Sequence, residues 1–308
     1  MSVAAAPRRI LTRREGIPPA GLLQLLGSVV LFGGAWPFTK YAVQQGAAPL
    51  WFAEGRAGLS CVSAFLLLAA LRRLRLPVRP DLPALLGVGL LQIGAFFAFV
   101  HAAVGWLPAG RTAVLANVTS IFVVPLSVIV LHESISALRW IATAISLAGV
   151  IVLIGPWGID WSQPGVLIGH AFLLSAGASW GVTIILVRRF PPHSSMLELL
   201  PWCLALASLM LLPILLAEAP QPGNWTPGAL AAVGFVGLLA GPVGTWCVMQ
   251  AAVTLPALVA SIGFLMTPAA GLLLATVWLG EPLTLSLALG SALILAGVVV
   301  AAWPPREA

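Results

Sequence analysis

Residues 131–152 read LHESISALRWIATAISLAGVIV, and residues 279–300 read LGEPLTLSLALGSALILAGVVV. The two stretches align at an offset of 148 residues, which pairs Glu133 with Glu281 and the motif LAGV with itself. Within the stretches the offset also pairs Gly149 with Gly297. It holds far upstream as well, where it pairs Gly33 with Gly181, Lys40 with Arg188 and Pro108 with Pro256. The chain is therefore one unit repeated twice, and this repeat constrains the other inferences.

The composition predicts a membrane protein. Hydrophobic residues make up 60% of the 308 residues, and charged residues make up only 8%. Soluble domains carry roughly 25% charged residues. Because a helix that spans a bilayer needs about 20 apolar residues, the chain is long enough for ten spans. The lipid bilayer is thus its first expected partner.

The basic residues indicate how the helices are oriented. The net charge is +6, and most arginines fall before the first apolar segment or after the second, fourth and sixth: Arg8, Arg9, Arg13, Arg14, Arg72, Arg73, Arg75, Arg79, Arg139, Arg188 and Arg189. With ten crossings, all these positions lie on one side of the membrane. This positive-inside bias predicts that both termini are cytoplasmic. The charge orients the helices and gives no indication of nucleic acid.

Apolar run lengths and turn signals predict an all-α integral membrane fold of ten transmembrane helices. The expected helices cover residues 20–43, 50–70, 82–103, 110–131, 137–155, 165–187, 195–217, 228–251, 257–278 and 284–303. They form one repeat over 20–155 and a second over 165–303, with a break at Pro156–Pro164. Residues 1–19 and 304–308 are expected to be cytoplasmic tails.

The number of helices in each repeat predicts how the halves are related. Five is an odd number, so the second copy must enter the membrane from the opposite face. Such inverted-topology repeats are typical of secondary transporters, in which two equivalent halves rock around a shared site near the middle of the membrane. The repeat therefore predicts alternating access of a small-molecule substrate.

Several motifs resemble one transporter family. They are FGGAWPFTK at residues 32–40, Glu54-Gly55-Arg56, and the two L-x-E motifs that end in Glu133 and Glu281. Together they resemble the drug/metabolite transporter superfamily, EamA type, over nearly the whole chain. The chain departs from this pattern at Phe32, where the family often has Trp, and at Leu204, where the second repeat has no echo of Arg56.

The resemblance implies ten helices with both termini inside and a location in the bacterial inner membrane. It also implies export of metabolites, and bacterial amino-acid exporters resemble this pattern most. We therefore expect export of small amphipathic metabolites, amino acids first, with the aromatic ones favoured by the Trp and Phe content. Multidrug efflux of cationic compounds is the alternative.

Polar groups and aromatic rings inside the spans are the candidate substrate-binding residues, because polar groups are costly in hydrocarbon and pockets favour aromatic walls. The candidates are Trp36, Lys40, Phe97, His101, Asn117, Trp180, Trp246 and Gln250. Lys40 either attracts a substrate carboxylate or reaches the outer headgroups. His101 either binds substrate, carries a proton, or is a satisfied core histidine, so proton coupling stays open.

Other residues have expected structural or mechanical roles. Arg56 either pairs with Glu54 or packs against the first helix. The two repeat-equivalent glutamates are expected to bond backbone groups at neighbouring helix ends. Pro125 and Pro268 interrupt helical hydrogen bonding and are candidate gating points. Small residues over 144–149 and 290–297 permit close packing, as scaffold or as the surface of a homodimer.

Enzyme chemistry has little support in the sequence. The motif around Ser179, GASWG, matches G-x-S-x-G, but a nucleophile elbow needs a strand-to-helix turn and a positioned histidine. An intramembrane serine hydrolase is therefore only a remote alternative. The cysteines, Cys61, Cys203 and Cys247, lie apart in apolar segments and are expected to be small buried residues. The sequence contains no HExxH, Walker A or CxxC motif, and we expect neither a metal nor a cofactor.

Overall fold

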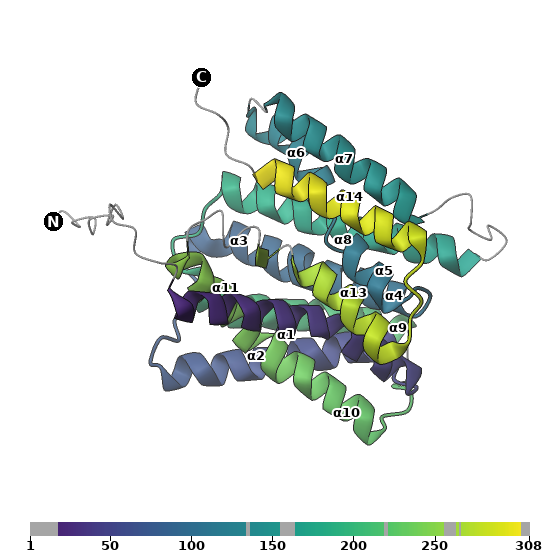
Figure 1. Ribbon diagram of the computed structural model, residues 1–308. Coiled ribbons are helices and arrows are strands. Elements are labelled where there is room, and N and C mark those ends of the chain that lie inside the picture. Colours follow the sequence, from purple (N-terminus) through teal and green to yellow (C-terminus); the bar gives the residue numbers. More distant parts are fainter. Residues whose placement is uncertain are drawn as a thin grey trace.

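The computed structural model describes residues 18–133, 136–154, 164–218, 221–255, 263–264 and 266–302. Within these ranges the regular structure is helical, and the only strand-like contact is an isolated bridge between Ala47 and Gly223. Figure 1 shows the helices side by side in one bundle, with α7 and α14 on one flank and α2 and α10 on the other. In the described part of the chain, six helical stretches are long and apolar enough to cross a membrane, and four apolar helices are shorter.

The helices of the first repeat fall on the expected stretches, with one exception. They are α1 Pro19–Gln44, α2 Pro49–Ala70, η1 Arg79–Asp81, α3 Leu82–Leu86, the π-helical η2 Gly87–Ala95, α4 Phe96–Val104, α5 Ala109–Leu115, α6 Ser120–Leu131 and α7 Ala137–Ile154. The exception is the expected fourth helix, which is divided into α5 and α6.

The second repeat follows the same order. Its helices are α8 Pro164–Arg189, α9 Met196–Glu218, α10 Pro227–Gly234, the π-helical η3 Phe235–Ala240, α11 Pro242–Thr254, α13 Met266–Leu279 and α14 Leu285–Ala302. Most of the expected break at Pro156–Pro164 and the start of the expected ninth helix lie outside the described residues.

A turn over residues 116–119 separates α5 from α6, so the expected continuous helix over 110–131 is wrong. The Asn117 side chain donates a hydrogen bond to the Ala113 carbonyl at 2.7 Å. The amides of Asn117 and Val118 bond carbonyls only three residues back, at 3.1 and 3.2 Å. Asn and Thr side chains compete with the backbone for hydrogen bonds. This competition ends α5 at Leu115, just before the turn.

Two π-helical segments begin at positions related by the repeat offset, η2 at Gly87 and η3 at Phe235. Each offers a carbonyl to a hydroxyl of the other repeat. Ser60 of α2 donates to the Gly237 carbonyl at 2.7 Å, and Thr183 of α8 donates to the Gly87 carbonyl at 3.0 Å. π-Helical turns are rare and occur frequently at functional sites. Apolar periodicity alone does not reveal them.

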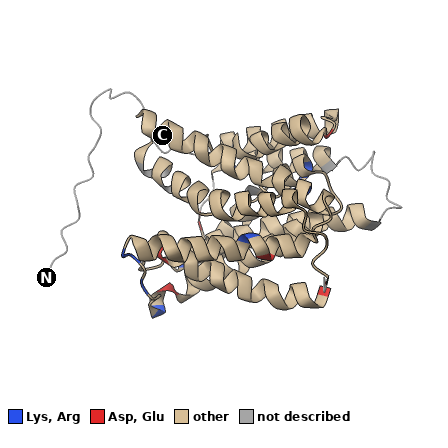
Figure 2. Cartoon of the chain, turned by 90° about the horizontal axis from the view of Figure 1, so that it is seen from below, with Lys and Arg blue, Asp and Glu red and all other residues tan. Residues whose placement is uncertain are grey.

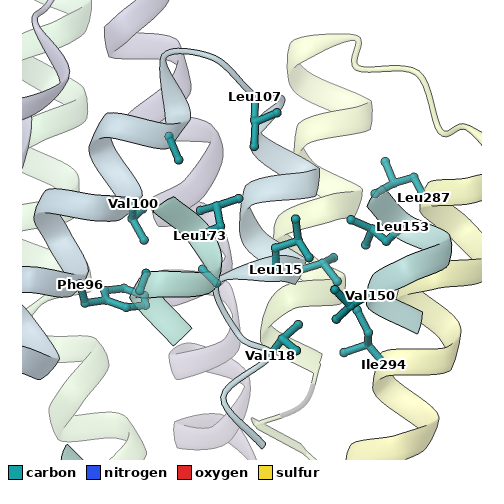
Figure 3. Packing of buried hydrophobic residues seen from close by; sticks show 14 residues of the cluster. Phe96, Val100, Leu107, Leu115, Val118, Val150, Leu153, Leu173, Leu287 and Ile294 are labelled. Carbon is teal, nitrogen blue, oxygen red and sulfur yellow. The ribbon is translucent and has the colours of Figure 1, made fainter. Parts of the chain in front are cut away.

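The largest hydrophobic cluster joins α4, α5, α7, α8 and α14 (Figure 3). Leu115, Leu153 and Leu173 are completely buried in it. The small residues of α7 and α14 face each other: a methyl group on Gly149 would lie 2.9 Å from the Gly290 carbonyl oxygen. These two helices therefore pack backbone to backbone, as the small-residue stretches predicted.

The ends of α6 and α13 yield a prediction about stability. α6 ends at His132 with φ 53°, and α13 is followed at the equivalent position by Gly280 with φ 68°. Glycine adopts this left-handed conformation without the steric cost that other residues bear. We expect His132→Gly to raise the free energy of unfolding by about 0.5–1 kcal/mol and Gly280→Ala to lower it. Thermal unfolding in detergent measures both, and shifts of the same sign would contradict this account.

Candidate functional site

An aromatic cluster links helices from both repeats inside the bundle. The ring of Phe96 on α4 lies with its centroid 6.5 Å from Trp36 of α1, 4.9 Å from Trp180 of α8 and 6.3 Å from its neighbour Phe97. The contacts with both tryptophans are edge-on, the geometry that aromatic quadrupoles favour. The structure thus brings together three of the predicted substrate-binding residues, Trp36, Phe97 and Trp180.

A polar group adjoins this cluster on the side of α2. The guanidinium carbon of Arg56 lies 4.2 Å from the centroid of the Phe97 ring, a cation–π contact. The same ring lies 5.8 Å from the imidazole of His101, which also stacks on Phe52 at 5.9 Å. Arg56, Phe97 and His101 therefore form one contiguous group, with Phe52 behind it.

His101 is completely buried, and only one of its two ring nitrogens has a partner among the described residues. Nδ1 lies 2.7 Å from the Phe97 carbonyl oxygen. Because a carbonyl only accepts, Nδ1 must carry the proton. Nε2 is then an acceptor, and it is buried without a hydrogen-bond partner in the described part of the chain. Buried nitrogens without partners are rare, so His101 is not a fully satisfied core histidine in this structure.

The expected ion pair between Arg56 and Glu54 does not form. One carboxylate oxygen of Glu54 accepts a hydrogen bond from the Ser208 hydroxyl of α9 at 2.7 Å. The other is buried and has no partner in the described ranges. Side chains two residues apart on a helix do not face each other, which explains why the pair fails.

Lys40 and Glu281 bind neighbouring backbone groups at the end of the bundle where α4 ends and α5 begins. Lys40 Nζ donates to the carbonyls of Val104 and Leu107, at 2.8 and 3.0 Å. Glu281 accepts from the amides of Ala109 and Gly110, at 2.6 and 2.9 Å, and its charge attracts the Lys40 ammonium. The predicted backbone role of Glu281 is confirmed, and Lys40 is directed at carbonyls rather than at headgroups.

The repeat-equivalent pair behaves differently. Arg188 and Glu133 form a direct ion pair at 2.5 Å, with 47% and 32% of their side chains exposed. The amides equivalent to those bound by Glu281 belong to Ala257 and Leu258, which lie outside the described residues. Among the described residues, the partner of Glu133's carboxylate is therefore an arginine and not a helix end.

The remaining predicted residues do not join the aromatic cluster. Asn117 is exposed in the turn after α5, Trp246 on α11 is 43% exposed, and Gln250 lies one turn further along α11. α11 packs on α1, α2 and η3. Pro125 lies inside α6, whereas Pro268 of α13 is buried and lines a small apolar cavity of about 170 Å³.

Residues that sequence reasoning missed are Phe52 and Phe96. Phe52 lies four residues before Arg56, and Phe97 lies four residues before His101, so each pair shares a helix face. That spacing was visible in the sequence. Figure 2 shows the charged residues mostly toward the ends of the helices. Arg56 is half-buried and lies about two turns inside α2.

Ser179 does not form a nucleophile site. It lies inside α8, and its hydroxyl donates to the Ala176 carbonyl at 2.8 Å, one turn earlier in the helix. A helical serine bonded to its own backbone has no base to activate it. The G-x-S-x-G match is therefore explained by local helix packing.

Comparison with known proteins agrees with this architecture. The profile of the EamA-like transporter family matches residues 19–155 and, a second time, residues 167–303. The uncharacterized transporter YoaV of Bacillus subtilis (strain 168) is 24% identical over 282 residues, which cover 90% of this chain and 94% of YoaV.

Two further relatives have names that state what they move. A probable amino-acid metabolite efflux pump of Salmonella typhimurium is 28% identical over 76% of this chain and 82% of its own. A probable terminal-alkyne amino-acid exporter of Streptantibioticus cattleyicolor is 27% identical over 73% and 75% of the two chains. A protein crystal structure superposes with a TM-score of 0.63 at 18% identity, covering 93% of this chain and 99% of its own, which shows a shared fold.

Proposed function

Because the chain belongs to the EamA-like transporter family, we propose that it exports small amphipathic metabolites across the bacterial inner membrane, with aromatic amino acids favoured. The observation that carries this proposal is the aromatic cluster of Trp36, Phe96, Phe97 and Trp180, which joins helices of both repeats beside the half-buried Arg56. Rings with one adjacent cation suit a solute that has an apolar body and an anionic head. The names of two relatives point to the same class of solute.

The proposed architecture has ten crossings in two inverted five-helix repeats, with both termini in the cytoplasm. Cross-repeat contacts support it, since the Glu281 carboxylate bonds the amides of Ala109 and Gly110 while Arg188 pairs with Glu133. In the proposed cycle the halves rock around the aromatic cluster, with Pro125 and Pro268 as bending points. Proton coupling through His101 and assembly into a homodimer belong to the same proposal.

Flux measurements test the proposal directly. Proteoliposomes loaded with radiolabelled phenylalanine should show saturable efflux that empty liposomes lack. Trp180→Ala should lower this efflux at least about tenfold, because losing contact with a large apolar side chain costs roughly 1.5–3 kcal/mol. Trp140→Ala, on the 45% exposed tryptophan of α7, is the matched control and should leave it unchanged.

Two outcomes would count against this function. Absence of saturable phenylalanine flux, together with robust flux of a cationic dye, would favour multidrug efflux. Equal losses from the Trp180 and Trp140 variants would show that the cluster has no special part in transport.

A further inference from the structure

We propose that Arg56 binds the carboxylate of the transported solute, so that the protein selects amphipathic carboxylates over their amides and over cations. This inference rests on the proposed transport function and identifies the residue that recognises the substrate's head. Arg56 can have this role only because it does not pair with Glu54, as one of its two expected contacts would have required.

The first argument is the uncompensated charge of Arg56. The ion pairs among the described residues are Arg73–Glu198 and Arg188–Glu133, and neither includes Arg56. The acidic neighbour on its own helix is turned toward Ser208. Arg56 is half-buried, and taking a charge even partly out of water without a partner is costly. A ligand carboxylate would supply the missing counter-charge.

The second argument is the way the guanidinium is held. Arg56 is the eighth residue of α2, about 10 Å along the helix from its first residue at 1.5 Å per residue. Its guanidinium packs over the Phe97 ring instead of extending toward the headgroups. No hydrogen bond or ion pair of the guanidinium is found among the described residues. Its N–H donors are therefore available there for the bidentate geometry that a carboxylate matches.

The third argument is what surrounds the guanidinium. Phe97 leads through Phe96 to Trp180, with centroid separations of 6.3 and 4.9 Å, so an aromatic body could follow a bound carboxylate. The Phe97 ring also contacts His101, whose Nε2 is a completely buried acceptor without a partner in the described residues. The ammonium group of an α-amino acid is a donor of the kind this nitrogen lacks.

The test compares three solutes that differ only in their polar heads: phenylalanine, 3-phenylpropionate and phenylalaninamide. In proteoliposomes, wild type should prefer phenylalanine to the amide at least tenfold, and 3-phenylpropionate should compete with phenylalanine. Arg56→Gln should lose this preference. Arg56→Lys keeps the positive charge but lacks the planar pair of N–H donors, so it should retain part of the preference for phenylalanine. Arg189→Gln is the matched control, because that arginine also lies over a phenylalanine ring, at 5.7 Å from Phe190, but is exposed.

A second readout separates this inference from the transport function. Thermal stabilisation of the detergent-purified protein by each solute reports binding without flux. Carboxylate-specific stabilisation that Arg56→Gln abolishes, in the absence of flux, would uphold the site and refute export. Flux of phenylalanine and its amide at equal rates, or unchanged selectivity in Arg56→Gln, would overturn the inference and leave export standing. If neither flux nor carboxylate-specific stabilisation is seen, both fail. If Arg56→Gln does not fold, Arg56→Lys decides the outcome in both assays.

Discussion

Glu281→Ala is expected to lower the free energy of unfolding by about 2–4 kcal/mol, because it removes two short hydrogen bonds to a charged group and leaves two helix-end amides unsatisfied. The carboxylate bonds the amides of Ala109 and Gly110 at 2.6 and 2.9 Å. It also attracts the Lys40 ammonium, which caps the end of α4 through two carbonyls. One substitution therefore loosens both sides of the loop between α4 and α5.

The repeat supplies the matched control. Glu133→Ala removes the equivalent carboxylate, but its ion pair with Arg188 is exposed to about a third or more on both sides. Exposed ion pairs contribute at most about 1 kcal/mol. Thermal unfolding in detergent, followed by tryptophan fluorescence, should show a far larger shift for the Glu281 variant. Equal shifts would mean that the two ends are held in the same way.

Gly149→Ala is expected to destabilise the protein by about 1–3 kcal/mol, the usual cost of overpacking. The added methyl would lie 2.8 Å from the backbone nitrogen of Ile294 and 2.9 Å from the Gly290 carbonyl oxygen. Backbone atoms cannot rotate aside as a side chain can, so α7 and α14 must separate. Because these two helices flank the largest hydrophobic cluster, their separation also loosens the core.

Gly234→Ala is the same chemical change in an open place. A methyl on Gly234 would meet no atom within 4 Å, and alanine is favoured over glycine inside a helix by up to about 1 kcal/mol. This variant should unfold at the wild-type temperature or above it. Destabilisation of both variants to the same degree would show that the loss of glycine itself, and not the helix contact, is responsible.

The sequence predicted the helical segments well, because the length of an apolar run depends only on the residues within it. It also predicted the backbone bonds of Glu281, because the position of a glutamate just beyond a helix end is local information. It did not predict the turn at Asn117 or the π-helical η2 and η3. Those depend on hydrogen bonds to side chains, and some of these come from the other repeat.

The candidate site was predicted in part for a similar reason. Their depth in the apolar segments predicts that Trp36, Phe97 and Trp180 line a site, and all three contact Phe96. The same depth predicts Trp246, but its side chain is 43% exposed on α11. Depth follows from sequence position, whereas the direction of a side chain depends on which helix packs against it.

The exchange of charges at the two ends bears on how such a chain could arise. Lys40 and Glu133 belong to one half, and Arg188 and Glu281 belong to the other. Arg188 pairs with Glu133, and Lys40 is attracted by the charge of Glu281, so each cation is compensated by the acid of the opposite half. A lone half would carry a cation and a carboxylate that do not pair with each other within that half. Two identical halves could compensate each other's charges at both ends. Gene duplication and fusion would then preserve contacts that a homodimeric ancestor already possessed.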